Sequence, residues 1–182
     1  MHLIIAAVLA LASATSAVAQ GHPSSGYAAM QGREIKSLSP EQMDDLREGR
    51  GMGASLPAEL NGIPGPMHVL QLKEQLKISA QQQEALERIT AEMKATAQQL
   101  GREVIAAEAD LDHAFKTGAA SEQRIRDSTR RIGELGANLR AVHLVAHLKT
   151  RQLLSADQVV AYNDARGYGA ASAMQPTHNP TH

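Results

Sequence analysis

The chain of 182 residues contains no cysteine and no tryptophan. Without cysteine it can form no disulfide and perform no thiol chemistry, even in an oxidising compartment. Aromatic side chains make up only 2% of the residues: Phe115, Tyr27, Tyr162 and Tyr168. A compact core that lacks aromatic rings has few large side chains to fill its volume. This composition therefore favours long helices that pack in pairs or between chains, and the length suits one domain.

The chain also has no excess of positive or negative charge, since its formal net charge is −1. A balanced chain offers no basic patch for a phosphate backbone, so we expect no nucleic-acid partner. The sequence has no Gly-x-Ser-x-Gly elbow, no phosphate-binding loop and no dinucleotide fingerprint. Its carboxylates occupy positions that a helix would expose, where nothing tunes their pKa. We therefore predict a binding protein that is not an enzyme and requires no cofactor.

Long apolar runs are absent after the first residues. The run at 3–11 is too short to span a bilayer, and Ala-Val-Ala at 17–19 supplies small residues for a cleavage site. Residues 1–19 therefore predict a cleaved secretory signal peptide and an exported protein. An uncleaved anchor is the alternative, because no Lys or Arg precedes the apolar run. We expect residues 20–37 to be flexible and residues 169–182 to be disordered.

Residues 38–168 are expected to form one helical domain. Two long segments, 80–116 and 121–153, carry apolar residues spaced alternately three and four apart, as in a coiled coil. Gly118 is expected to end the first helix, so the pair should form an antiparallel hairpin. The predicted fold is all-α, a long helical hairpin with short flanking helices and a loop over 49–66. The short helices are expected at 40–49, 66–77 and 156–166.

The same phrase begins three of these helices. It runs at 38–42, 78–82 and 154–158, and each copy is an aliphatic residue followed by Ser-x-x-Gln. The Ser hydroxyl can accept from the backbone N–H three residues later, and the Gln can reach back to the Ser N–H, which makes a capping box. Each copy therefore predicts a helix start.

The phrase resembles the LTxxQ motif of the Spy/CpxP family, with Ser in place of Thr, and the resemblance covers residues 38–168. The stretches 51–53, 59–70, 147–154 and 166–168 are similar to the metal-sensor-like branch of that family. The resemblance implies a periplasmic, ATP-independent chaperone or envelope-stress accessory protein, which is our first interpretation. The alternative is a periplasmic heavy-metal sensor. A third interpretation is an adaptor that docks on a membrane-bound sensor kinase or anti-sigma factor.

Two histidines could bind a metal. His143 and His147 are four residues apart and so share one helical face, which suits Zn, Ni, Co or Cu. His68 begins a helix that should fold back towards them, so His68, His143 and His147 form the candidate ligand set. Glu92 or a methionine such as Met52 is a candidate for a further ligand. The alternative is that the histidines merely flank the apolar stripe.

The segment 139–148 is apolar nearly all round. One side of it should serve the hairpin, and the other side needs a partner. Burial under the short helices, a homodimer interface and a surface for unfolded envelope proteins are the three alternatives. We expect a dimer, and we assign the client or dimer surface to Leu139, Leu144, Val145 and Leu148.

Overall fold

A computed structural model describes residues 26–168. The predicted signal peptide and the predicted tail at 169–182 lie outside the described residues. The chain divides into residues 1–31, whose described part contains the short 3₁₀ helix η1 (Ala28–Met30), and residues 32–182. Residues 26–168 form helices and turns without a strand, which confirms the all-α prediction. None of the helices in this range is long and apolar enough to cross a membrane.

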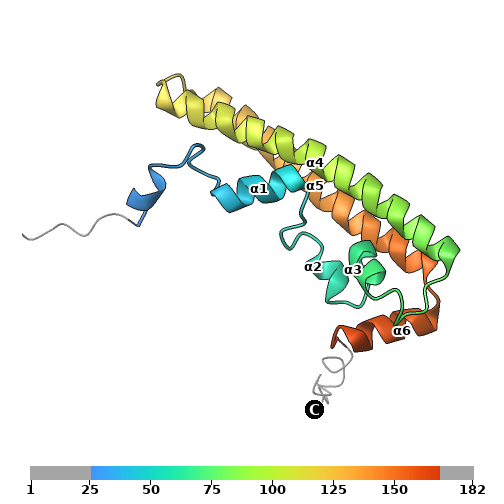
Figure 1. The fold of residues 1–182 in the computed structure, drawn as a ribbon. Coiled ribbons are helices and arrows are strands. Elements are labelled where there is room, and N and C mark those ends of the chain that lie inside the picture. Colours follow the sequence, from blue (N-terminus) through green and yellow to red (C-terminus); the bar gives the residue numbers. More distant parts are fainter. Residues whose placement is uncertain (1–25, 169–182) are drawn as a thin grey trace, which may run out of the picture. The chain divides into compact units, whose positions relative to one another are not determined.

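The second unit holds the helices labelled in Figure 1. They are α1 (Pro40–Glu48), α2 (Leu56–Glu59), α3 (Pro66–Gln71), α4 (Ala80–Lys116), α5 (Glu122–Leu153) and α6 (Ala156–Ala165).

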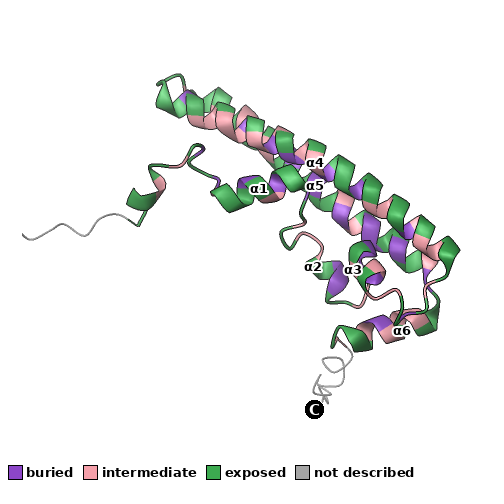
Figure 2. Cartoon of the chain, viewed as in Figure 1, coloured by how far each residue is buried: buried purple, intermediate pink, exposed green. Residues whose placement is uncertain are grey.

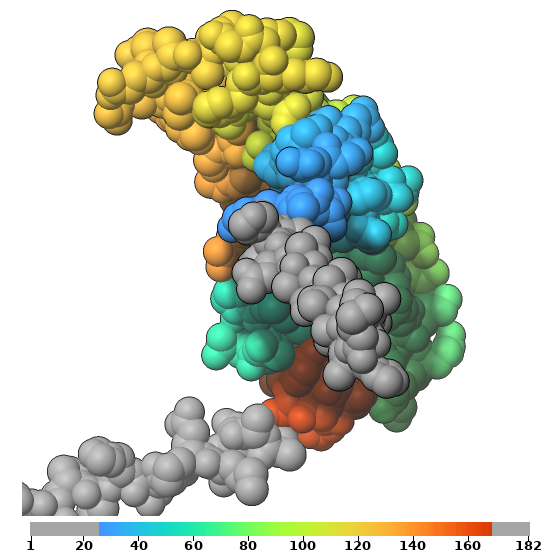
Figure 3. Space-filling model, turned by 90° about the vertical axis from the view of Figure 1, so that its left-hand side faces the viewer, coloured from blue at the N-terminus to red at the C-terminus, as the bar shows by residue number. Residues whose placement is uncertain are grey.

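The long helices α4 and α5 pack against each other as the predicted antiparallel hairpin (Figure 1). Their limits agree with the sequence prediction, because local signals set them. Ser79 and Ser121 each accept a hydrogen bond from the first turn, and Gly118 adopts a φ of 71° at the turn. The tip of the hairpin lies at one end of this unit and α6 lies at the other (Figure 3).

Near the middle of the hairpin, α1 packs on α4. Their contact includes Leu46, Ala97 and Val104, with Leu139 from α5. The helices approach closely at Gly101, where an added Cβ would lie 2.0 Å from the carbonyl oxygen of Leu46. The structure corrects the assignment of Leu139 to a client or dimer surface, because this side chain is only 7% exposed and belongs to the core.

A second core lies at the open end of the hairpin and includes Val69, Leu86 and Tyr162. Here two of the three capping boxes meet. The side-chain amide of Gln82 donates to Gln158 Oε1 at 2.8 Å, and that of Gln158 donates to Gln82 Oε1 at 3.1 Å. The repeated phrase thus starts helices, as predicted, and also ties the starts of α4 and α6 together.

Two short elements differ from the prediction. The expected loop over 49–66 contains α2, whose start has a proline at its second position, a favourable place for a residue without an N–H. The helix that begins at Pro66 ends at Gln71, and turns continue to Lys77, which has a φ of 49°. A side chain with a Cβ rarely adopts that left-handed conformation, and no helix can run through it.

The packed unit also begins before residue 38. Ile35 is 3% exposed and joins the core beneath α1. The N–H of Lys36 donates to Asp112 at 3.2 Å, and the Ser37 hydroxyl donates to Glu108 at 2.7 Å. These contacts hold residues 35–37 against α4. This last part of the segment that was expected to be flexible is therefore packed.

Candidate functional site

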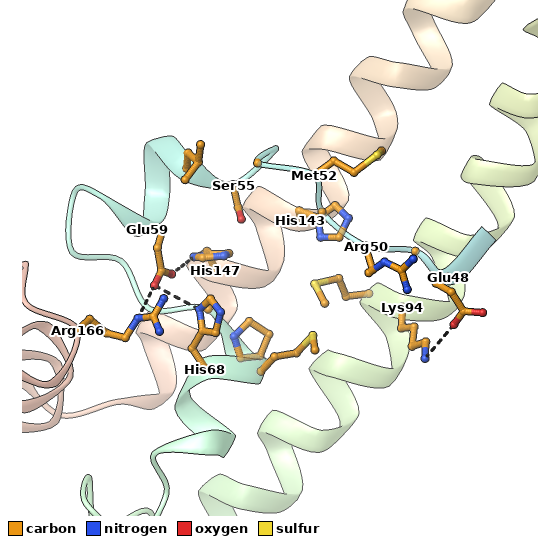
Figure 4. Close-up of a pocket in the computed structure, with 18 of the residues that line it drawn as sticks. Glu48, Arg50, Met52, Ser55, Glu59, His68, Lys94, His143, His147 and Arg166 are labelled. Carbon is orange, nitrogen blue, oxygen red and sulfur yellow. Dashed lines mark ion pairs between the residues drawn. The ribbon is translucent and has the colours of Figure 1, made fainter. Parts of the chain in front are cut away.

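All buried residues of α5 except Leu135 lie in its C-terminal half, which runs past α2 and α3 (Figure 2). A pocket of about 560 Å³ opens there between the 49–55 loop, the short helices and the hairpin (Figure 4). Imidazole, thioether and cationic groups line it. They include His68, His143, His147, Met52, Met67, Met93, Arg50, Lys94 and Arg166, together with Glu48 and Glu59.

Two glycines let the chain lie directly on the histidine rings of α5. A Cβ added to Gly65 would lie 2.8 Å from Nε2 of His147. A Cβ added to Gly51 would lie 3.4 Å from Nδ1 of His143. The two imidazoles are therefore covered by backbone, and each is only 5% exposed.

His147 is held in one orientation by the loop. Its Nδ1 lies 2.8 Å from the carbonyl oxygen of Ile63, so Nδ1 must carry the proton and donate it. In the neutral ring, Nε2 then keeps a lone pair. Metal-binding histidines commonly have this arrangement, in which a backbone carbonyl fixes the tautomer of the ligand.

His143 differs because its Nε2 is buried and has no hydrogen-bond partner. Burial lowers the pKa of His143, and the nearby His147 lowers it further. The ring is therefore neutral at pH 7, with one nitrogen able to act as a ligand. Buried polar atoms without a partner are rare, and an ion or a water commonly accounts for them.

Glu59, at the end of α2, joins the short helices to one another. Its Oε1 accepts hydrogen bonds from the hydroxyls of Tyr162 and Tyr168, the latter at 3.1 Å. The same oxygen lies 3.2 Å from Nδ1 of His68 and 3.3 Å from Nε of Arg166. One carboxylate thus connects α2, α3 and the end of α6 (Figure 4).

The other oxygen of Glu59 is buried without a hydrogen-bond partner and lies 3.8 Å from Nδ1 of His147. Burial alone would raise the pKa of this carboxyl. The hydrogen bond from Tyr162 and the charge of His68 outweigh burial, so its pKa lies below the ordinary value. Glu59 is therefore a carboxylate at neutral pH.

The structure brings His68, His143 and His147 to the same pocket, but Glu92 does not join them. Glu92 is exposed and pairs with Lys149 at 3.3 Å. The prediction of Glu92 as a further ligand is therefore wrong. Within residues 26–168, no group of three or more His, Cys, Asp or Glu side chains is arranged to hold a metal ion. Sequence reasoning missed Glu59, whose only signal is its place in the 59–70 stretch.

A separate apolar groove of about 450 Å³ follows the seam between α4 and α5. Ile89, Leu100, Val142 and Val145 line it, and the Glu92–Lys149 pair lies at its edge. Of the predicted client or dimer residues, Val145 and Leu148 are 47% and 52% exposed, and Leu144 is half-buried.

No family model, curated protein or solved structure matches this chain.

Proposed function

We propose that this chain is a periplasmic metal-binding protein of the Spy/CpxP type that holds a transition-metal ion in the pocket between the 49–55 loop and α5. One observation carries the proposal. Nε2 of His143 and Oε2 of Glu59 are buried without hydrogen-bond partners, and both residues line that pocket. Such a group lowers stability by about 1–3 kcal/mol unless something pairs with it. A cation bound to the lone pair of His143 Nε2 would remove that cost at this atom.

The donor chemistry fits a transition metal better than Ca²⁺ or Mg²⁺. His143 and His147 lie one helical turn apart, and a neutral imidazole offers one nitrogen lone pair to a metal ion. Oε1 of Glu59 is already engaged by Tyr162 and Arg166, so only Oε2 of this carboxylate remains for an ion, whereas Ca²⁺ takes about six to eight oxygen ligands. Imidazole and thioether donors suit the later transition metals.

A bound ion would also give the protein a way to report the metal. The ion would fix the 49–55 loop to α5. The adjoining helix α2 begins at Leu56 and has Leu60 as its C-cap, and these two side chains are 51% and 62% exposed. Exposed apolar side chains on a segment whose order depends on the ion suit recognition by another protein. A membrane-bound sensor kinase or anti-sigma factor is the class of partner that we propose.

The test is a titration of the chain with Co²⁺, Zn²⁺ and Ag⁺ by calorimetry. We expect one tight site for at least one of these ions, and His143→Ala should weaken its binding at least a hundredfold. His113→Ala is the matched control, because His113 lies on α4 at the far end of the hairpin and is exposed. Equal loss in both variants, or no saturable binding by the wild type, would contradict the proposal.

The second candidate function is that of an ATP-independent chaperone, and the groove along α4 and α5 favours it. An open apolar groove with charges at its edge can hold unfolded chains weakly and shield them from aggregation. The same surface could instead be covered by a second copy of the chain. These proposals need no metal, so they are tested separately.

If the groove holds clients, Val145→Asp should abolish most of the suppression of aggregation of a heat-denatured client enzyme, measured by light scattering. Val160→Asp is the control, because Val160 is 60% exposed on α6 and does not line the groove. Sedimentation of the wild type and of both variants tests whether the groove is instead a dimer interface. A wild-type dimer that Val145→Asp dissociates, with no client protection in either, would assign the groove to the second copy.

A further inference from the structure

The pocket is rich in thioether sulfur. Three of the chain's seven methionines, Met52, Met67 and Met93, line it. Met93 is buried, whereas Met52 and Met67 are 47% and 52% exposed. An apolar side chain exposed at the mouth of a pocket gains little from burial, so filling the core explains only Met93.

The backbone at Met52 has an unfavourable conformation for any residue with a side chain. Its φ is 45°, in the left-handed region, and it stands between Gly51 and Gly53. Glycine would adopt this conformation without steric conflict. Strained residues of this kind concentrate at functional sites, where the side chain has a role that offsets the strain. Gly51, the residue before Met52, lies directly against the His143 ring.

The charges around the pocket largely cancel, so they do not select the ion. Arg166 pairs with Glu59, Lys94 lies 3.9 Å from Glu48, and Arg50 pairs with Asp45. The remaining donors are imidazole and thioether groups, which are neutral. The ligands themselves, rather than the charge of the lining, therefore decide which ion the pocket favours.

The thioether and imidazole ligands point to one class of ion. We infer that the pocket takes a soft monovalent cation of the Cu(I)/Ag(I) class, with His143 and the Met52 sulfur among its ligands. This inference rests on the proposed function and adds the identity of the ion and the role of Met52.

The probe is Ag⁺, which undergoes no redox change under the conditions of the titration. Calorimetry on the full chain should show that Ag⁺ binds at least a hundredfold more tightly than Zn²⁺ or Co²⁺. Met52→Gly should weaken Ag⁺ binding at least tenfold without lowering the melting temperature, because glycine relieves the strain at this position. A purely structural methionine would show the opposite pattern. Met43→Leu, in the core of α1 and away from the pocket, should leave Ag⁺ binding unchanged.

The outcomes separate the inference from the proposal beneath it. If Zn²⁺ or Co²⁺ binds as tightly as Ag⁺ and Met52→Gly changes neither, the inference fails while metal binding at His143 stands. If none of the three ions binds the wild type at a site that His143→Ala removes, the proposed function fails as well. Ag⁺ binding that Met43→Leu and Met52→Gly weaken equally also overturns the assignment of Met52.

Discussion

Replacing Gly101 with alanine should lower the free energy of unfolding by about 3 kcal/mol. The new methyl carbon would lie 2.0 Å from the carbonyl oxygen of Leu46 and 2.7 Å from its carbonyl carbon. Both are backbone atoms, so no side chain can turn aside and α1 must move away from α4. Chemical denaturation of the variant and the wild type measures the difference.

The chain provides a matched control for this substitution. Gly133 and Gly136 also lie inside a long helix, but a Cβ added to either would meet no atom within 4 Å. Alanine favours a helix over glycine by about 1 kcal/mol, so Gly133→Ala and Gly136→Ala should each stabilise the protein. Stabilisation by Gly101→Ala of the same size would show that α1 does not pack on α4 in this way.

The second large effect is expected at Glu59. Glu59→Ala should lower the free energy of unfolding by about 3–4 kcal/mol, because it removes the carboxylate that accepts from the buried hydroxyl of Tyr162 and pairs with Arg166. Glu92→Ala is the control, since the exposed pair of Glu92 with Lys149 should contribute at most about 0.5 kcal/mol. Similar losses in the two variants would contradict the central role of Glu59.

The contribution of Glu59 should also depend on pH. Its pKa in the folded protein lies below that in the unfolded chain, so the stabilising effect is complete above about pH 4.3 and is lost as the pH falls through the folded value. The difference in unfolding free energy between the wild type and Glu59→Gln should therefore shrink in acid. A difference that stays constant from pH 6 to pH 3 would show that this carboxyl does not titrate as described.

The long elements could be predicted from the sequence because their signals are local. The capping serines, Gly118 and the apolar stripes fix α4 and α5 without reference to any distant residue. Proximity in the fold was harder to predict. Glu92 and Met93 are neighbours in α4, yet only Met93 faces the pocket. A three-four stripe places a helical face to within about one residue, which is too coarse to separate them.

Glu59 was missed for a different reason. Its hydroxyl partner Tyr162 lies 103 residues further along the chain, and no local pattern links the two. Leu139 was assigned to an external surface because its surroundings in the sequence are apolar on every side. Only the position of α1, which packs over that part of the hairpin, shows that Leu139 is internal. Contacts between segments that are distant in the sequence therefore give Glu59 its partners and bury Leu139 in the core.

The central claim is that His143 binds a metal ion in the pocket beneath the 49–55 loop. Crystals of the silver-loaded chain, measured for anomalous scattering from the bound ion, test it most directly. We predict one strong peak within bonding distance of Nε2 of His143, and no such peak in crystals of His143→Ala grown the same way. A silver peak only at His113 or at the histidines of the 169–182 tail, or no ordered peak at all, would contradict the claim.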